Sequence, residues 1–96
     1  MKLKNKKPLQ SIIEEAFSLD NLFKKTRVQT YVVARSVFFY LSYKEGFALY
    51  KVAQAVNLNH ATALNARNRF DTYYNYYKEY RSSIDYVISE WAGDKE

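Results

Sequence analysis

The residues best suited to chemistry lie in one short stretch, LYKVAQAVNLNHATALNA, at residues 49–66. Its polar side chains include Asn59, His60 and Thr62, whose amide, imidazole and hydroxyl groups donate and accept hydrogen bonds. Thr62 also carries a methyl group, so this set is suited to contact the edges of nucleic-acid bases. The alternative is an ordinary helix start, in which Asn59 is only an N-cap and His60 only an exposed residue.

The same stretch matches the pattern of a helix-turn-helix. A small residue, Ala53, stands where the two helices would touch, and Asn57, four positions later, tolerates the left-handed conformation of the turn. Asn59 is placed to cap a second helix that begins at His60. A plain helical hairpin shows the same pattern, so both interpretations stay open on this evidence. The apolar positions around the turn and in the second helix are Val52, Val56, Leu58 and Ala63.

Positive charge is concentrated in the middle of the chain. The net charge is +5, and residues 24–69 hold eight Lys or Arg against a single acid, Glu45. The last 27 residues hold six acids against three bases, and residues 2–7 add four Lys. This asymmetry favours a polyanion as partner, with an ordinary solvated surface as the alternative.

The composition excludes several classes of protein. With no Cys, one His and two Gly, the chain cannot form a disulfide, a thiolate metal site or a glycine-rich phosphate loop. It shows neither a paired acid and base nor a nucleophile with its base, so we expect no enzyme, no metal and no cofactor. No uncharged stretch reaches the roughly 18 residues that a membrane helix needs. We therefore expect a cytoplasmic protein that does not enter membranes.

Helical spacing of apolar residues dominates the chain, and the expected fold is all-α with five to six helices. A first helix should follow Pro8, and a short second helix should bury Leu22 and Phe23. A third helix should cover residues 28–43, with Gly46 as its C-terminal cap.

The second helix of the motif is expected to be long. Helical spacing continues after Ala66, which predicts a recognition helix from His60 to about Arg81, about 22 residues or ~33 Å. Ser82 or Ser83 would then cap a last helix that runs through Trp91. The predicted organisation is a basic flexible tail at residues 1–8, a single domain at residues 9–92 and a second tail at residues 93–96.

The C-terminal third is rich in tyrosine. These side chains are expected to pack the long helix against the first helices. Because Tyr is favoured at interfaces, a homodimer or another protein partner is the alternative, and base stacking is a third one. The tyrosines are Tyr73, Tyr74, Tyr76, Tyr77, Tyr80 and Tyr86.

The chain resembles a known family in three segments that follow one another in order: FSLDNLFKKTR, VVARSVFFYL and LYKVAQAVNLNHATALNA. Together they resemble the C-terminal DNA-binding domain of the bacterial chromosomal replication initiator DnaA, over about residues 12–70. The eight-residue step from Arg27 to Arg35 is also kept in that family. The resemblance implies a helix-turn-helix of the Trp-repressor type that reads a short element of double-stranded DNA.

The resemblance also implies roles for individual residues. Arg27 falls on the arginine of the basic loop that enters the minor groove, and Arg35 on an arginine that holds a backbone phosphate. Leu49 and Tyr50 fall where the first motif helix touches the major groove. The complete expected DNA-binding set is Lys25, Arg27, Arg35, Leu49, Tyr50, Lys51, Asn59, His60, Ala61, Thr62, Asn65 and Arg69.

The sequence departs from the family at several of these positions. Asn59 replaces an Asp, Ala61 replaces a Thr, and Tyr50 stands where Pro is common. The turn at residues 57–58 lacks the family's Gly-Gly-Arg, so we expect a different or relaxed base preference. The family's ATPase domain has no counterpart in this sequence. This predicts a stand-alone replication or transcription regulator of the kind that phages or mobile elements carry. The alternative is a protein-interaction module on the same scaffold that has lost DNA reading.

Overall fold

Pro8 leads into helix α1 (Leu9–Phe17), as the fixed φ angle of proline suits a helix start. The computed structural model describes residues 8–93, so the predicted tails lie outside it apart from Pro8 and Gly93. Helix α1 buries one face, made by Leu9, Ile12, Ile13 and Phe17. It ends at Ser18, whose φ of 57° is left-handed and whose N–H bonds back to the helix.

Residues 19–28 form a loop, and the short second helix predicted there is wrong. Leu22 is nevertheless fully buried, as expected from its position. Distant side chains satisfy the backbone of this segment: the carboxylate of Glu14 accepts from the N–H of Leu22 at 2.8 Å, and Arg35 donates to three loop carbonyls. These hydrogen bonds take the place of the backbone hydrogen bonds that a helix would form in this segment.

The long central helix α2 (Gln29–Lys44) matches the predicted third helix to within one residue at each end. The N–H of Gly46 bonds to the carbonyl of Tyr43 at 2.9 Å, and that of Phe47 to the carbonyl of Ser42 at 3.2 Å. With Gly46 at φ 94°, this is a Schellman cap, and the predicted role of Gly46 is confirmed.

The two helices predicted in this stretch are α3 (Leu49–Ala55) and α4 (His60–Asn68), with a tight turn between them. Asn57 has a φ of 62°, and the N–H of Leu58 bonds back to the carbonyl of Ala53 at 2.8 Å. Ala53 is almost fully buried and packs in one cluster with Ala63. Both residues are small enough to let the two helices approach, as the sequence indicated.

The long recognition helix predicted from His60 to Arg81 is wrong. The span is divided into α4, α5 (Phe70–Tyr76) and a 3-10 turn η2 (Lys78–Tyr80). The predicted last helix follows as α6 (Arg81–Gly93), which begins ahead of Ser82 and Ser83, so neither serine is its cap. Arg69 sits at a bend, with φ −93° and ψ 0°, and Tyr77 leaves the helix altogether at ψ 85°. Arg81 caps the end of α5 by donating to the carbonyls of Tyr74 and Asn75, both at 3.1 Å.

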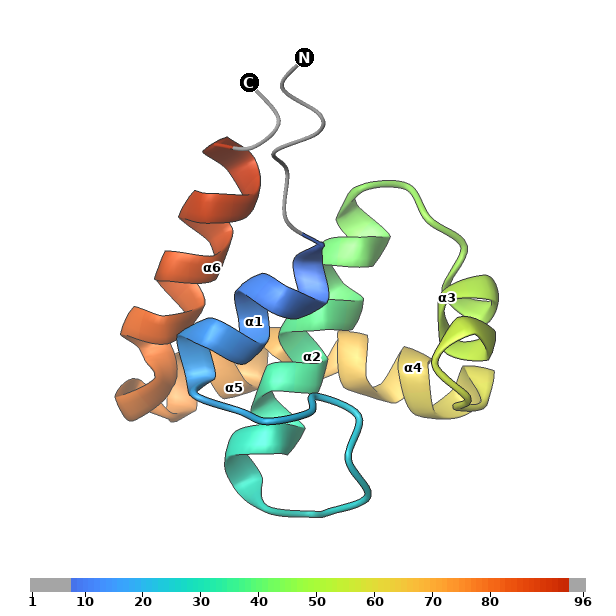
Figure 1. Ribbon diagram of the computed structural model, residues 1–96, viewed down its shortest axis with the longest axis horizontal. Coiled ribbons are helices and arrows are strands. Elements are labelled where there is room, and N and C mark those ends of the chain that lie inside the picture. Colours follow the sequence, from blue (N-terminus) through green and yellow to red (C-terminus); the bar gives the residue numbers. More distant parts are fainter. Residues whose placement is uncertain (1–7, 94–96) are drawn as a thin grey trace.

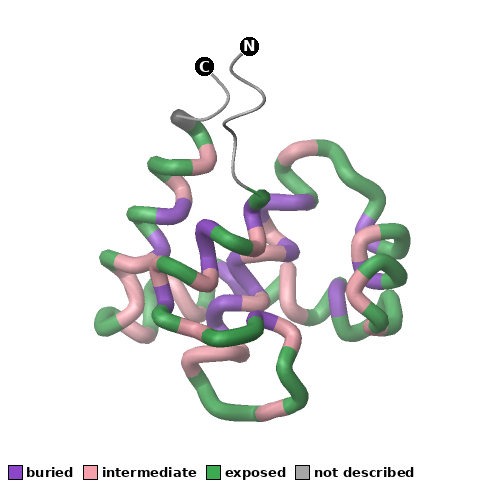
Figure 2. The backbone as a smooth tube through the Cα atoms, in the orientation of Figure 1, coloured by how far each residue is buried: buried purple, intermediate pink, exposed green. Residues whose placement is uncertain are grey.

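These elements make an all-α fold around two buried clusters (Figures 1 and 2). The larger cluster joins α1, α2, α5 and α6, and the smaller one joins α2, α3 and α4 around Phe39. Within the part that the structure describes, no helix is long and apolar enough to cross a membrane. Most of the tyrosines pack against the larger cluster as expected, namely Tyr73, Tyr74, Tyr77 and Tyr80.

We predict that Ile84→Ala strongly destabilises the protein. Ile84 is fully buried in the larger cluster, so its truncation should lower the free energy of unfolding by about 2–5 kcal/mol. Urea denaturation followed by circular dichroism measures this change, with Ser82→Ala on the exposed side of α6 as control. A loss no larger than that of the control would contradict the packing of α6 against the core.

Candidate nucleic-acid interface

The basic loop, residues 24–27 (Lys24-Lys25-Thr26-Arg27), is held in shape by Arg35 of α2. The Arg35 Nε donates to the carbonyl of Leu22 at 2.9 Å, Nη1 to that of Thr26 at 3.1 Å and Nη2 to that of Lys24. Burial lowers the pKa of Arg35 from its usual value. Three of the Arg35 donors are committed to the loop, while the contact of Arg35 with a backbone phosphate stays a prediction.

Asp20, near the start of the loop formed by residues 19–28, also holds this segment in place. The carboxylate of Asp20 accepts from the Tyr31 hydroxyl at 2.6 Å and from the N–H of Asn21 at 2.8 Å, and it pairs with Lys24 at 3.4 Å. The hydrogen bond from Tyr31 is the main cause that lowers the pKa of Asp20. Asp20 therefore offsets part of the charge of Lys24, while Lys25 and Arg27 lie exposed on the loop.

The start of α4 is exposed as predicted. Asn59 is its N-cap, and its Oδ1 accepts from the backbone N–H of Thr62 at 2.8 Å. This bond leaves the Asn59 amide group as a hydrogen-bond donor. The residues of the first turns, His60, Ala61, Thr62 and Asn65, are all exposed.

Two adjoining hollows connect the basic loop to α4. The first, about 530 Å³, has Phe23 and Leu58 as apolar lining and the basic loop as its charged lining. The second, about 200 Å³, runs along α4 and is lined by the polar side chains of Thr62, Asn65 and Arg69 and by apolar or aromatic ones that include Val32, Ala66 and Tyr73. Arg35 and Leu58 line both hollows, so together they form one surface, which we call the basic groove. None of the described residues that line the basic groove is acidic.

The basic groove unites many of the predicted residues but not all of them. Leu49 is only 7% exposed and packs beside Phe39, so we place its side chain in the core and withdraw its predicted DNA contact. Lys51 lines a different depression, the apolar groove described below. Tyr50 is exposed and lies edge-on to His60, with ring centroids 6.5 Å apart. The predicted residues that line the basic groove are Lys25, Arg27, Arg35, Thr62, Asn65 and Arg69.

Sequence reasoning missed the role of two residues that shape this region. Leu58 and Phe23 were predicted as apolar packing positions, and nothing in the sequence indicates that they also line a surface hollow. Arg67 lies on another face of α4, with its guanidinium 4.4 Å from the centre of the Tyr43 ring. Only the contact itself distinguishes Arg67 from an ordinary solvated arginine.

No protein-family model matches this chain, and neither a curated protein nor a solved structure matches it. Among the described residues, no group of three His, Asp or Glu could hold a metal ion.

We predict that Arg35→Lys loosens the basic loop. Lysine keeps the charge but cannot reach three carbonyls with a planar fork of donors. Trypsin should therefore cleave after Lys24, Lys25 or Arg27 at least several-fold faster than in the wild type. Mass spectrometry of a digestion time course locates these cuts. Lys44→Gln is the matched control, and equal cleavage rates in the wild type and Arg35→Lys would show that the loop does not depend on Arg35.

Proposed function

We propose that this protein binds double-stranded DNA through the basic groove, with the start of α4 in the major groove and the basic loop at the neighbouring minor groove. The observation that carries the proposal is the shared surface of the basic loop and α4, which Arg35 and Leu58 join and whose described lining residues include no acid. Clustered positive charge suits the phosphates of a polyanion, and polar side chains on the adjacent helix suit hydrogen bonds to the edges of DNA bases.

The exposed face of α4 has the chemistry of a recognition helix. A helix with its side chains is about 10–12 Å across, which fits the roughly 12 Å width of the major groove. Thr62 and Asn65 present a hydroxyl, a methyl and an amide on one side of the helix, beside Arg69. An amide is the usual partner of adenine, while a methyl suits thymine.

The basic loop supplies the second contact of the proposal. Arg27 is exposed on a loop whose backbone Arg35 already holds. A narrow minor groove attracts arginine through its negative potential. Because the loop is ordered before binding, less conformational entropy is lost when it contacts DNA.

The resemblance to the DNA-binding domain of DnaA supports the same assignment. It implies a basic loop, a central helix and a helix-turn-helix in the order in which the chain carries them. On this basis we propose a cytoplasmic regulator of replication or transcription, phage- or mobile-element-like, that occupies a DNA site without catalysis or a cofactor. The changes at Asn59 and Ala61 favour a base preference different from that of the family.

A protein-interaction role is the second candidate. It is favoured by a separate apolar groove and by two exposed tyrosines of the C-terminal region, Tyr76 at 73% and Tyr86 at 44%. Salt dependence separates the two candidates, because contacts to DNA phosphates release counterions whereas an apolar contact does not.

We predict that Arg27→Ala weakens binding to every duplex. A ligand is first selected from a random duplex library, and fluorescence anisotropy then follows affinity between 50 and 200 mM salt. With about six phosphate contacts the wild type should lose roughly 10³-fold over this range. Arg27→Ala should make the log–log salt slope shallower by about 1. Lys78→Ala, on η2 away from the basic groove, is the control. A flat wild-type slope, or no selected ligand, would favour the interaction module.

We predict that Asn65→Ala and Thr62→Ala change base preference rather than general affinity. Each variant should lose about 1–3 kcal/mol of discrimination at one base pair. Repeating the selection with each variant reveals the affected position, and Thr72→Ala on the exposed side of α5 serves as control. An unchanged preferred sequence in both variants would mean that α4 is not the reading helix.

A further inference from the structure

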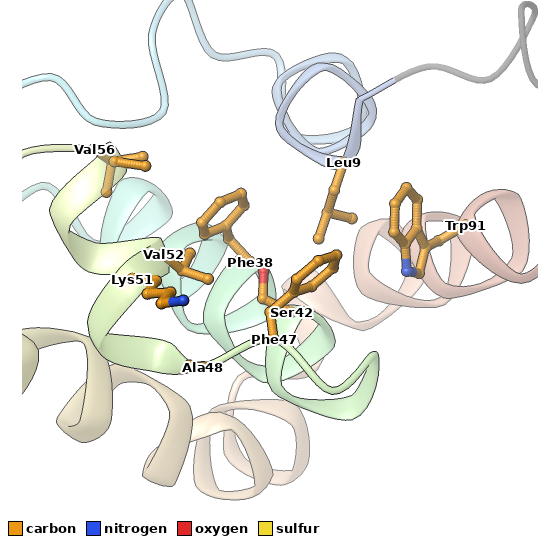
Figure 3. Close-up of a pocket in the computed structure, with 10 residues that line it drawn as sticks. Leu9, Phe38, Ser42, Phe47, Ala48, Lys51, Val52, Val56 and Trp91 are labelled. Carbon is orange, nitrogen blue, oxygen red and sulfur yellow. The ribbon is translucent and has the colours of Figure 1, made fainter.

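A second depression, the apolar groove, lies between α1, α2, α3 and α6 (Figure 3). It has a volume of about 410 Å³, within the range of pockets that hold ligands. Leu9, Phe38 and Phe47 surround one part of it, Val52 comes from α3, and Trp91 comes from α6. Its lining is therefore contributed by four helices and by the connection between α2 and α3.

Phe47 makes the groove unusual for a free surface. This large apolar side chain is 58% exposed at the groove, where it gains little from burial. Covering exposed apolar area is worth roughly 25 cal/mol per Å². A partner that covers Phe47 and fills the groove would gain this free energy.

The charge of the lining indicates which partner is suitable. Among the described residues that line the groove, Lys51 is the charged one and none is acidic. A second copy packed groove to groove, with the two-fold axis passing near Lys51, would bring two Lys51 side chains together, and the chain's own residues 2–7 carry four lysines. Like charges in close approach are unfavourable, so both of these occupants are disfavoured.

We propose that the apolar groove docks an amphipathic helix of another protein, with an apolar stripe and a carboxylate that pairs with Lys51. Helices commonly bind such grooves through side chains at positions i, i+3, i+4 and i+7. The carboxylate fixes the register of the helix, and the apolar stripe supplies affinity.

The position of the groove permits docking while DNA is bound. Phe38 and Ser42 place it at the C-terminal half of α2, whereas the basic loop immediately precedes the N-terminus of that helix (Figure 1). Phe38 and Ser42 share one face of α2, and Arg35 and Phe39, which line the basic groove, share the neighbouring face, so the two grooves open on different faces of this helix. The protein can then link a DNA site to a partner.

The test is selection from a displayed library of amphipathic helical peptides against the full-length protein. Enriched peptides should carry an apolar stripe and at least one acidic residue next to it. In fluorescence anisotropy, replacing that acid by Lys should weaken binding at least tenfold. Ala55→Glu places a carboxylate in the groove one turn after Lys51 and should also weaken binding at least tenfold. The matched control is Gln54→Glu, which adds the same charge on the same helix outside the groove lining.

Three results would overturn the proposal. The first is that the selection enriches no peptide, or only peptides that lack an acid and that bind Ala55→Glu as tightly as they bind the wild type. The second is a concentration-dependent dimer in sedimentation that Ala55→Glu abolishes, which assigns the groove to a second copy. The third is that Leu3→Asp binds the peptide more tightly than the wild type does. This result would mean that the first residues of the chain itself occupy the apolar groove. Circular dichroism checks that each variant is folded.

Discussion

The bonding of Arg35 to the loop carbonyls is the interaction on which the candidate site depends. A partly buried guanidinium is costly unless its donors are satisfied, and here the backbone of residues 22–26 satisfies them. The same bonds fix where the loop runs, so that Lys25 and Arg27 are exposed beside α4. Asp20, which pairs with Lys24, offsets part of the repulsion among these cations. The partly buried Arg35 thus determines where the exposed Lys25 and Arg27 lie.

The features that the sequence predicted well are those that depend on neighbours in the chain. Gly46 and Asn57 end their helices in the left-handed conformation, which few residue types tolerate. Asn59 caps the helix that follows it through a bond to a residue three positions away. Ala53 and Ala63 meet because a tight turn leaves room only for small side chains. The all-α fold, the helix-turn-helix and the exposed start of α4 follow from such local rules.

The errors arose where contacts distant in sequence decide the structure. Leu22 has the burial expected of a helical residue, but the Glu14 carboxylate, eight positions away, binds its N–H in a loop. The predicted long helix bends at Arg69 without losing its period, because the N–H of Tyr73 still bonds to the Arg69 carbonyl at 3.0 Å. Apolar spacing therefore continues across the bend, and periodicity cannot detect it. The side chain of Leu49 could not be assigned to core or surface before its packing near Phe39 was known.

The two proposed surfaces are joined through a pair of aromatic rings. Phe23 lines the basic groove and Phe38 lines the apolar groove, and their ring centroids are 5.0 Å apart in an edge-to-face contact. Phe39 lies against both rings and is fully buried. Because a close-packed interior transmits displacement rather than absorbing it, a ligand that moves Phe38 would press on Phe23 and the adjacent basic loop. These three rings therefore offer one physical route for energetic coupling between a docked helix and bound DNA.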